Sequence, residues 1–383
     1  MYLKRLLKFV PVRVRERVKI GRRAANARVT RPETDAASLA NTARRVNVDE
    51  DAGAVFTDEQ STILLIDELQ QAGISATDVN KLKAAGFSTI RQLVMFPRKN
   101  IVAVKGFSDA KADKVLESAL KMLPESESGG FITAAEDCER RKSVLHITCG
   151  AAAVDAILNG GFETRAITEI FGEWRCGKTQ ICHTLAVTTQ MPIEMGGGCS
   201  KVAWIDTENT FRSDRLEAIA DRFGLDRDAV LSNVMVARVD TVDQMMQALI
   251  AIGAKMAEEP FKLLIVDSIM AIFRVDYVAR GELSERQQTL NQFLSRLRKL
   301  AEEFNVAVVL TNQVQSDPGG MAFAGVEPKK PIGGHVLAHA STIRLQVRKG
   351  RAEARVIKVL QGPTLKEDEA EFQITEGGVA GME

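Results

Sequence analysis

The sequence contains little cysteine, tryptophan or tyrosine, and it has no long apolar run. Its 383 residues include two Trp and two Tyr. The five cysteines are odd in number and form no C-x-x-C pair, which argues against a disulfide framework or a cysteine zinc site and favours a reducing compartment. No apolar run approaches the ~18 residues that a membrane-spanning helix needs. We therefore expect a globular protein with no membrane partner.

A charge surplus is also missing from the chain as a whole, but the charge is unevenly distributed. The net charge is +1, yet residues 1–48 carry 13 Lys and Arg against Glu16, Glu33 and Asp35. This stretch has a net charge of +10, so the remaining residues sum to −9. If the rest of the chain binds nucleic acid, it must do so through local basic clusters.

Residues 1–56 show no sustained hydrophobic period and are rich in arginine. This composition predicts a basic, mostly disordered extension. Because the segment is also poor in acidic residues, an organelle transit peptide is the second interpretation. The solvated tail is the favoured interpretation of the two.

Residues 57–123 contain short stretches of helical apolar spacing that end at glycine or proline, as at Gly86 and Pro124. They predict a small all-helical domain. The stretch VKGFSDAKADKVL predicts two helices joined by a tight turn at Gly106. Such a turn is typical of helix-hairpin-helix DNA-binding units, but a plain packing module has the same pattern, and both interpretations stay open.

A linker, 124–137, separates this domain from a region in which strand-length apolar runs alternate with helical patterns. Alternation of this kind predicts an α/β core over residues 138–383, with a central, mostly parallel sheet flanked by helices. The runs that we expect to be strands are RAITEIFG, SKVAWIDTE, NVMVARV, KLLIVDS, AVVLTNQ, TIRLQVRK and ARVIKVL.

The motif GEWRCGKT, residues 172–179, has the form G-x-x-x-x-G-K-T and lies between a predicted strand and a predicted helix. Backbone N–H groups of such a loop cradle the phosphates of ATP, Lys178 reaches the β- and γ-phosphates, and the Thr179 hydroxyl holds Mg²⁺. The motif therefore predicts ATP and Mg²⁺ as cofactors. The nucleotide-binding residues predicted here, besides these two, are Gly172, Glu173, Arg175, Cys176, Gly177 and Gln180.

Three predicted strands end in polar residues. Asp267 ends KLLIVD and supplies a second magnesium anchor. Glu208 follows WIDT and is placed to activate water, while Gln313 follows AVVLTN and is a candidate sensor of the γ-phosphate. Taken alone, Glu208 could equally be an exposed acid at a strand end. The common position favours a functional site, because ligands bind at the carboxyl ends of parallel strands.

The segments FGEWRCGKTQ, WIDTENTFRSDRL, LLIVDSIMAIFRVDYVARGELSERQQ, LTNQV and EPKKPIGGHVLAHAST together resemble the RecA/RadA family of ATP-dependent DNA strand-exchange proteins. The resemblance covers roughly residues 60–383. TENTFR, DSIMAIFRVDY and ELSERQQ are closer to the meiosis-specific eukaryotic branch than to the mitotic one. The resemblance implies a RecA-type P-loop ATPase fold, a nuclear protein, catalysis by Glu208 and Gln313, and adenine stacking by Arg215.

The linker contains FITA, in which Phe131 and Ala134 stand among polar residues. An apolar pair in such a place suggests a strand that docks on another chain. The family resemblance implies that this element inserts into a pocket of a neighbouring subunit, here around Met235 and Ala237. Packing of FITA on its own core is the alternative.

Two loops are expected to contact DNA. The first, RVDYVARGELSERQ, carries Arg274 and Arg280 near a glycine, and the second, QSDPGGMAFAGVEPKK, is rich in glycine and carries Phe323. Arginines neutralise phosphates, and an apolar side chain can separate base steps, which gives sequence-tolerant binding to single strands.

The sequence thus predicts a DNA-dependent ATPase that pairs homologous DNA and exchanges strands as a filament or ring on single-stranded DNA. Its expected partners are single- and double-stranded DNA, further copies of itself, and mediator or accessory proteins of recombination. The alternatives are a general, mitotic-type recombinase, a non-exchanging mediator paralogue and a ring helicase. The FITA element, Glu208 and the two loops disfavour the mediator paralogue. The N-terminal helical domain and the FITA element disfavour the helicase.

Overall fold

The computed structural model describes residues 63–124, 126–277, 279–316 and 329–382. The predicted basic extension, residues 1–56, lies outside these ranges, as does Phe323. Within them, no helix combines the length and apolar character required to cross a bilayer.

The first described part of the chain is all-helical, as the sequence predicts. Ser75, Thr89 and Ser108 each accept a backbone N–H from three residues further on and so begin a helix. Gly106, at φ +84°, turns the chain between the last two helices. The helices enclose an apolar core of their own, and their bounds are η1 (Ile66–Gln70), α1 (Ala76–Ala84), α2 (Ile90–Met95), α3 (Arg98–Val102) and α4 (Asp109–Met122).

A nine-stranded sheet dominates the described part of the core, in the order β13-β12-β11-β10-β3-β7-β6-β4-β5. From β10 to β5 all neighbours are parallel, whereas β11, β12 and β13 extend the sheet antiparallel. The predicted mostly parallel sheet is therefore confirmed. Its strands are β3 (Ile167–Gly172), β4 (Lys201–Asp206), β5 (Val234–Arg238), β6 (Phe261–Asp267), β7 (Ala307–Asn312), β10 (Ile343–Lys349), β11 (Arg355–Gln361), β12 (Glu369–Thr375) and β13 (Gly378–Ala380).

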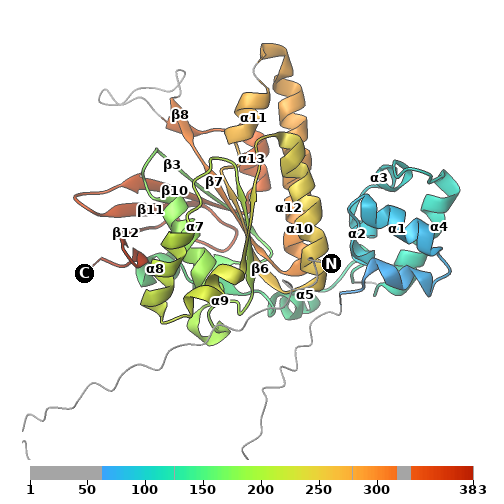
Figure 1. Ribbon diagram of the computed structural model, residues 1–383, viewed down its shortest axis with the longest axis horizontal. Coiled ribbons are helices and arrows are strands. Elements are labelled where there is room, and N and C mark those ends of the chain that lie inside the picture. The colour runs from blue at the N-terminus through green and yellow to red at the C-terminus, as the bar shows by residue number, and fades with distance from the viewer. Residues whose placement is uncertain (1–62, 125, 278, 317–328, 383) are drawn as a thin grey trace, which may run out of the picture. The chain divides into compact units, whose positions relative to one another are not determined.

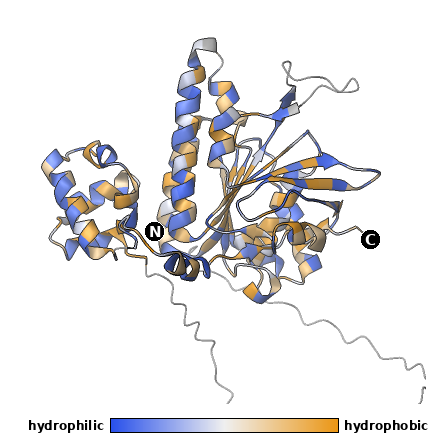
Figure 2. Ribbon diagram, turned by 180° about the vertical axis from the view of Figure 1, so that it is seen from behind, coloured by the Kyte–Doolittle hydropathy of each residue, from blue (hydrophilic) through white to orange (hydrophobic). Residues whose placement is uncertain are grey.

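Helices cover both faces of this sheet, which explains why the strands β3, β4, β6 and β7 are buried at nearly every position. In β4, Val202 and Trp204 face one core, while Ala203 and Ile205 face the other. Figure 2 shows the central strands mostly in the hydrophobic colour. Figure 1 shows α7 (Lys178–Thr188), α8 (Ser213–Phe223) and α9 (Arg227–Ser232) on one face, and α10 (Val242–Glu258) and α12 (Leu283–Phe304) on the other.

Shorter elements complete the described core. The pair β1 (His146–Ile147) and β2 (Phe162–Glu163) is antiparallel, as is the pair β8 (Val314–Ser316) and β9 (Lys329–Pro331). The remaining helices are α5 (Ala134–Arg141), α6 (Ala152–Ile157), η2 (Ile193–Met195), α11 (Ala271–Asp276), η3 (Arg280–Glu282) and α13 (Gly334–Ala340).

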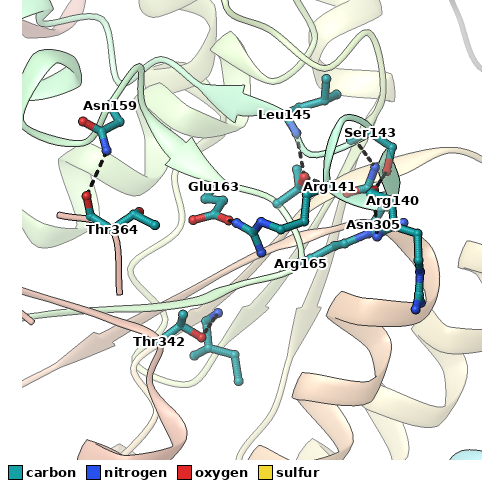
Figure 3. Close-up of polar contacts among 12 residues, drawn as sticks. Arg140, Arg141, Ser143, Leu145, Asn159, Glu163, Arg165, Asn305, Thr342 and Thr364 are labelled. Atoms are coloured by element: carbon teal, nitrogen blue, oxygen red, sulfur yellow. Dashed lines mark hydrogen bonds and ion pairs between the residues drawn. The ribbon is translucent and has the colours of Figure 1, made fainter. Parts of the chain in front are cut away.

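Polar contacts attach the segment around β1 and β2 to the rest of the core (Figure 3). Arg141 donates to the Glu163 carboxylate at 2.5 Å, and Asn305 donates to the Ser143 carbonyl at 2.6 Å. The Thr164 hydroxyl donates to Asn305 at 2.7 Å. This anchoring lies at the beginning of β3, whereas the phosphate loop follows its end.

Candidate nucleotide-binding site

The predicted phosphate loop connects β3 to α7, and its glycines are required by its geometry. Gly177 has φ +107°, in the left-handed region. At Gly172, an added Cβ would lie only 2.1 Å from the Val347 carbonyl oxygen. Only glycine fits either position without strain. The resulting turn leads directly into the first turn of α7, whose N–H groups have no partner within the helix.

This loop forms one wall of a cavity of about 770 Å³. That volume lies within the range of small-molecule and cofactor sites, ~300–1,000 Å³. The loop, three strand ends and the C-terminal strands contribute the lining, which consists of Gly172, Trp174, Arg175, Gly177, Lys178, Thr179, Gln180, Glu208, Thr210, Asp267, Ser268, Thr311, Gln313, Val314 and Ile374.

Most of the predicted nucleotide-binding residues line this cavity, but Glu173, Cys176 and Arg215 are not among the described residues that form its wall. The Glu173 carbonyl accepts a hydrogen bond from Lys178, and the Cys176 side chain is fully buried beneath the loop. Burial raises the pKa of the Cys176 thiol. Contact of Glu173 and Cys176 with a nucleotide, through the backbone of the loop, stays a prediction.

Lys178 is one of two positively charged side chains of the loop, the other being Arg175. Its ammonium donates to the carbonyl oxygens of Gly172 at 3.0 Å and Glu173 at 2.8 Å. It lies at the N-terminus of α7, where the helix dipole is positive. Both features favour a phosphate group in the adjoining part of the cavity.

Asp267 is buried at the end of β6 and accepts hydrogen bonds from three threonines. Thr179 donates at 2.8 Å and Thr210 at 3.3 Å, and Thr311 donates to the other carboxylate oxygen. Burial raises the pKa of the Asp267 carboxyl, while the hydrogen bonds from Thr311 and Thr179 lower it. Carboxylate and hydroxyl oxygens are hard donors, so Thr179 and Asp267 fit the requirements of Mg²⁺.

Glu208 lies at the edge of the cavity and is held by two donors. The Ser268 hydroxyl donates to its Oε1 at 2.6 Å, and the Gln313 amide donates to the same oxygen at 2.8 Å. Among the described residues, the second oxygen, Oε2, has no hydrogen bond. One carboxylate oxygen is thus fixed, and the other is available to a water molecule or a ligand.

Asp206 fixes the turn that carries Glu208. Its buried carboxylate accepts the backbone N–H groups of Glu208 at 3.3 Å, Thr210 at 3.1 Å and Phe211 at 3.1 Å. These bonds close the chain after β4 into a compact turn. The position of Glu208 is therefore set by the backbone as well as by its side-chain partners.

Arg215, predicted to stack on adenine, lies on α8 beside the cavity. It donates to the Gln180 side chain at 2.8 Å and to the carbonyl oxygens of Thr375 and Glu376. The guanidinium thus connects α7 and α8 to the β12–β13 turn. Adenine stacking by Arg215 stays a prediction.

The structure brings one of the predicted DNA-contacting residues next to the site. Arg274, on α11, donates to the Gln313 side chain at 3.5 Å. Arg280 is the first residue of η3. The orientation of the Arg280 side chain and the whole of Phe323 fall outside the described part of the chain.

The FITA element differs from the predicted docking strand. Thr133 caps α5 through a reciprocal pair of hydrogen bonds with Glu136, so Ala134 is the first residue of a helix. Phe131, just before it, is fully exposed at 110%. The predicted acceptor residues Met235 and Ala237 are partly buried on β5, the last strand at its edge of the sheet.

Sequence reasoning missed several residues of the site. Ser268, Thr210 and Thr311 line the cavity, and Asp206 supports it from below. All lie within two residues of a predicted site residue, at the ends of β4, β6 and β7. Their position at the same strand ends indicated that they belong to the site. Their hydrogen-bond partners could not be predicted from that position.

Comparisons with known proteins agree with this geometry. The Rad51 family model matches residues 140–382. A protein named meiotic recombination protein DMC1 homolog from Lilium longiflorum is 55% identical over 323 residues, covering 84% of this chain and 91% of that protein. The DMC1/LIM15 homolog of Homo sapiens is 53% identical over 327 residues, covering 85% of this chain and 95% of that protein.

The match extends from the end of α5 to the C-terminal strands and so includes the phosphate loop, Glu208, Asp267 and Gln313. The aligned lengths also reach into the helical part that precedes the core. The chain therefore belongs to the Rad51 family of RecA-type recombinases.

Proposed function

We propose that this chain is an ATP-dependent recombinase that pairs homologous DNA and exchanges strands in meiotic recombination, as a filament on single-stranded DNA. The observation that carries the proposal is the Glu208–Gln313 hydrogen bond at 2.8 Å. It joins the candidate catalytic carboxylate to the strand that continues into the second predicted DNA loop. The relatives named as meiotic recombination proteins support the meiotic role.

The residues of the site have separable tasks in this proposal. Bound ATP supplies a phosphoanhydride bond whose hydrolysis allows release of DNA and turnover. Lys178 and the first-turn N–H groups of α7 neutralise phosphate charge, and Thr179 and Asp267 would hold Mg²⁺. Glu208, with Oε1 fixed by Ser268 and Gln313, orients water through its other oxygen and accepts its proton.

Gln313 connects this chemistry to DNA. It hydrogen-bonds to Glu208 through its amide nitrogen and receives Arg274 through its amide oxygen. A DNA phosphate that attracts Arg274 would therefore change the environment of Gln313, and through it Glu208. The partners that this function requires are single- and double-stranded DNA, further copies of the chain, and recombination mediators. The protein would act in the nucleus.

Electron microscopy with single-stranded DNA and ATP tests the proposal, together with a strand-exchange assay on homologous and heterologous duplexes. We expect helical filaments and product formation from the homologous duplex alone. Dispersed particles without exchange would favour a mediator paralogue, and closed rings with duplex unwinding would favour a helicase. Exchange in a meiotic-null and a mitotic-null genetic background would separate the meiotic recombinase from a general one.

A further inference from the structure

We propose that Glu169, a buried carboxylate on β3, is a positioning residue that fixes Gln313 against Glu208 through the Asn312 amide. Glu169 is not among the described residues that line the cavity, and the hydrogen bonds of its carboxylate go to Asn312 and Arg344. The proposal rests on the role of Gln313 in the proposed function. It adds a buried connection between the strand that enters the phosphate loop and the strand that ends at Gln313.

Glu169 is fully buried, with 0% of its surface exposed, in the middle of the sheet. Its strand lies between β7 and β10. Its Oε1 accepts a hydrogen bond from Asn312 at 2.8 Å, and its Oε2 accepts one from Arg344 at 2.8 Å. A buried carboxylate is tolerated only with such partners, and the Arg344 guanidinium balances its charge.

The surroundings of the Asn312 side chain allow one orientation of its amide. The nitrogen Nδ2 donates to Glu169 and, at 2.7 Å, to the Ile332 carbonyl oxygen. The oxygen Oδ1 accepts the backbone N–H of Gln313 at 2.9 Å. Two acceptors on one side and a donor on the other leave no alternative, because a flipped amide would mismatch all three contacts.

This amide holds Gln313 by its backbone. The Gln313 N–H binds Asn312, and its carbonyl oxygen accepts the Ile332 N–H at 3.0 Å. Beyond these contacts, Val314 pairs with Pro331 at the base of the β8–β9 hairpin. The Gln313 side chain then reaches Glu208 from a backbone fixed on both sides.

Both oxygens of the Glu169 carboxylate accept a hydrogen bond. Glutamine, which has nearly the same shape, has only one such oxygen and cannot replace it. In Glu169→Gln, one of the two donors, Arg344 or Asn312, would face an NH₂ group. The charged guanidinium competes better for the remaining oxygen, so Asn312 loses one of the two acceptors of its amide nitrogen and faces an unfavourable donor instead. The contacts with Ile332 and with the Gln313 N–H remain, so we expect Gln313 to be held less firmly rather than released.

The measurement is ATP turnover by the full chain with and without single-stranded DNA, together with the affinity for ATP. For Glu169→Gln we expect DNA-stimulated turnover to fall about tenfold, since misplacing a group by ~1 Å can cost up to ~10²-fold in rate. We expect kcat to carry this loss while KM and ATP affinity change less than about twofold, because the phosphate loop is untouched.

Two further variants keep the test decisive even if Glu169→Gln does not fold. Asn312→Ala preserves the Glu169–Arg344 pair but removes the connection to Gln313, and it should reproduce the loss of DNA-stimulated turnover. Glu163→Gln is the matched control, because Glu163 is also a buried carboxylate paired with an arginine, Arg141 (Figure 3). It should retain the wild-type ratio of turnover with and without DNA.

The outcomes separate this proposal from the one it rests on. A wild-type chain with no DNA-stimulated turnover would remove the proposed function itself. A stimulated wild type, combined with an Asn312→Ala variant that is stimulated equally well, would overturn the role of Glu169 alone. An equal loss in Glu163→Gln would also overturn it, since the effect would then follow from any broken buried pair.

Discussion

The nucleotide site and the segment around Phe131 differ in whether their side chains have partners within the described part of the chain. In the site, Lys178, Asp267 and Glu208 each have hydrogen-bond partners within the chain. Phe131 is fully exposed, although burial of a phenylalanine stabilises by ~1.5–3 kcal/mol. The difference teaches that one subunit suffices to shape the phosphate loop, whereas the exposed Phe131 fits the predicted contact with a second copy.

We expect the largest effect from a substitution in the nucleotide site. Lys178→Ala should reduce ATP-dependent filament formation and strand exchange to background, because the variant lacks the ammonium that the motif places against the β- and γ-phosphates. Nucleotide binding and filament length on single-stranded DNA are the measurements. Lys142→Ala, at an exposed lysine paired with Glu139, is the control. Full nucleotide affinity in Lys178→Ala would refute the assignment of the loop.

A charged substitution at Phe131 should leave the nucleotide site intact and abolish the assembly of the chain into oligomers. Phe131→Glu would place a carboxylate in the apolar pocket that we predict on a second copy, at a cost of several kcal/mol. Light scattering should show a smaller species than the parent, and Phe131→Leu should retain much of the assembly. An oligomer of unchanged size in Phe131→Glu would mean that FITA packs within its own chain.

Glu208→Gln sharpens the comparison, because it should change the chemistry without changing assembly. The amide cannot accept a proton from water, so hydrolysis should slow by ~10²-fold, while ATP binding and filaments persist. Turnover and filament length are measured on the same sample, with Glu217→Gln on α8 as the control. Wild-type turnover would transfer the catalytic role to another residue.

The smallest effect should come from Arg280→Ala in the first predicted DNA loop. Loss of one phosphate contact should weaken single-stranded DNA binding and reduce the slope of log affinity against log salt by about 0.7. Arg227→Ala, at an exposed arginine paired with Asp221 on another helix, should leave the slope unchanged. An identical slope in both variants would exclude Arg280 from the DNA surface.

The sequence predicted those parts of the site that depend on local pattern. Asp267, Glu208 and Gln313 each follow an apolar run of strand length, and parallel strands bring such ends to one edge. The glycines of the phosphate loop were predicted from the spacing of the motif GEWRCGKT. The structure adds the reason at Gly172, where a side chain would meet the Val347 carbonyl of the neighbouring strand β10.

The contacts between these strand ends could not be predicted, because they depend on the order and register of the sheet. Ser268 reaches Glu208 because β4 lies beside β6 with Asp206 opposite Asp267. A local sequence pattern does not predict that β4 lies beside β6 or that β3 lies between β7 and β10. The hydrogen-bond partners of Glu169 could not be predicted for the same reason.

The helix that begins at Ala134 shows a different kind of miss. The sequence TAAE offers Thr133 and Glu136 at the spacing of a capping box, which is a helix-start signal. We interpreted the apolar residues of FITA as a docking strand and therefore did not predict that a helix begins there. The strands β12 and β13 were not among the predicted strands. β12 places Ala370, Phe372 and Ile374 at alternate positions, so its strand signal was present and was overlooked, whereas β13 has only three residues and offers no periodic pattern.

The two tryptophans of the chain have opposite surroundings. Trp204 is buried in the core at 1% exposure, whereas Trp174 is 77% exposed on the cavity wall, with the Arg175 guanidinium 4.2 Å from its ring centroid. Indole emission depends on polarity and on nearby charge, so the buried indole gives a steady background while Trp174 responds to what enters the cavity. The protein therefore carries its own optical reporter of the phosphate loop, and a Trp174→Phe spectrum would supply the baseline.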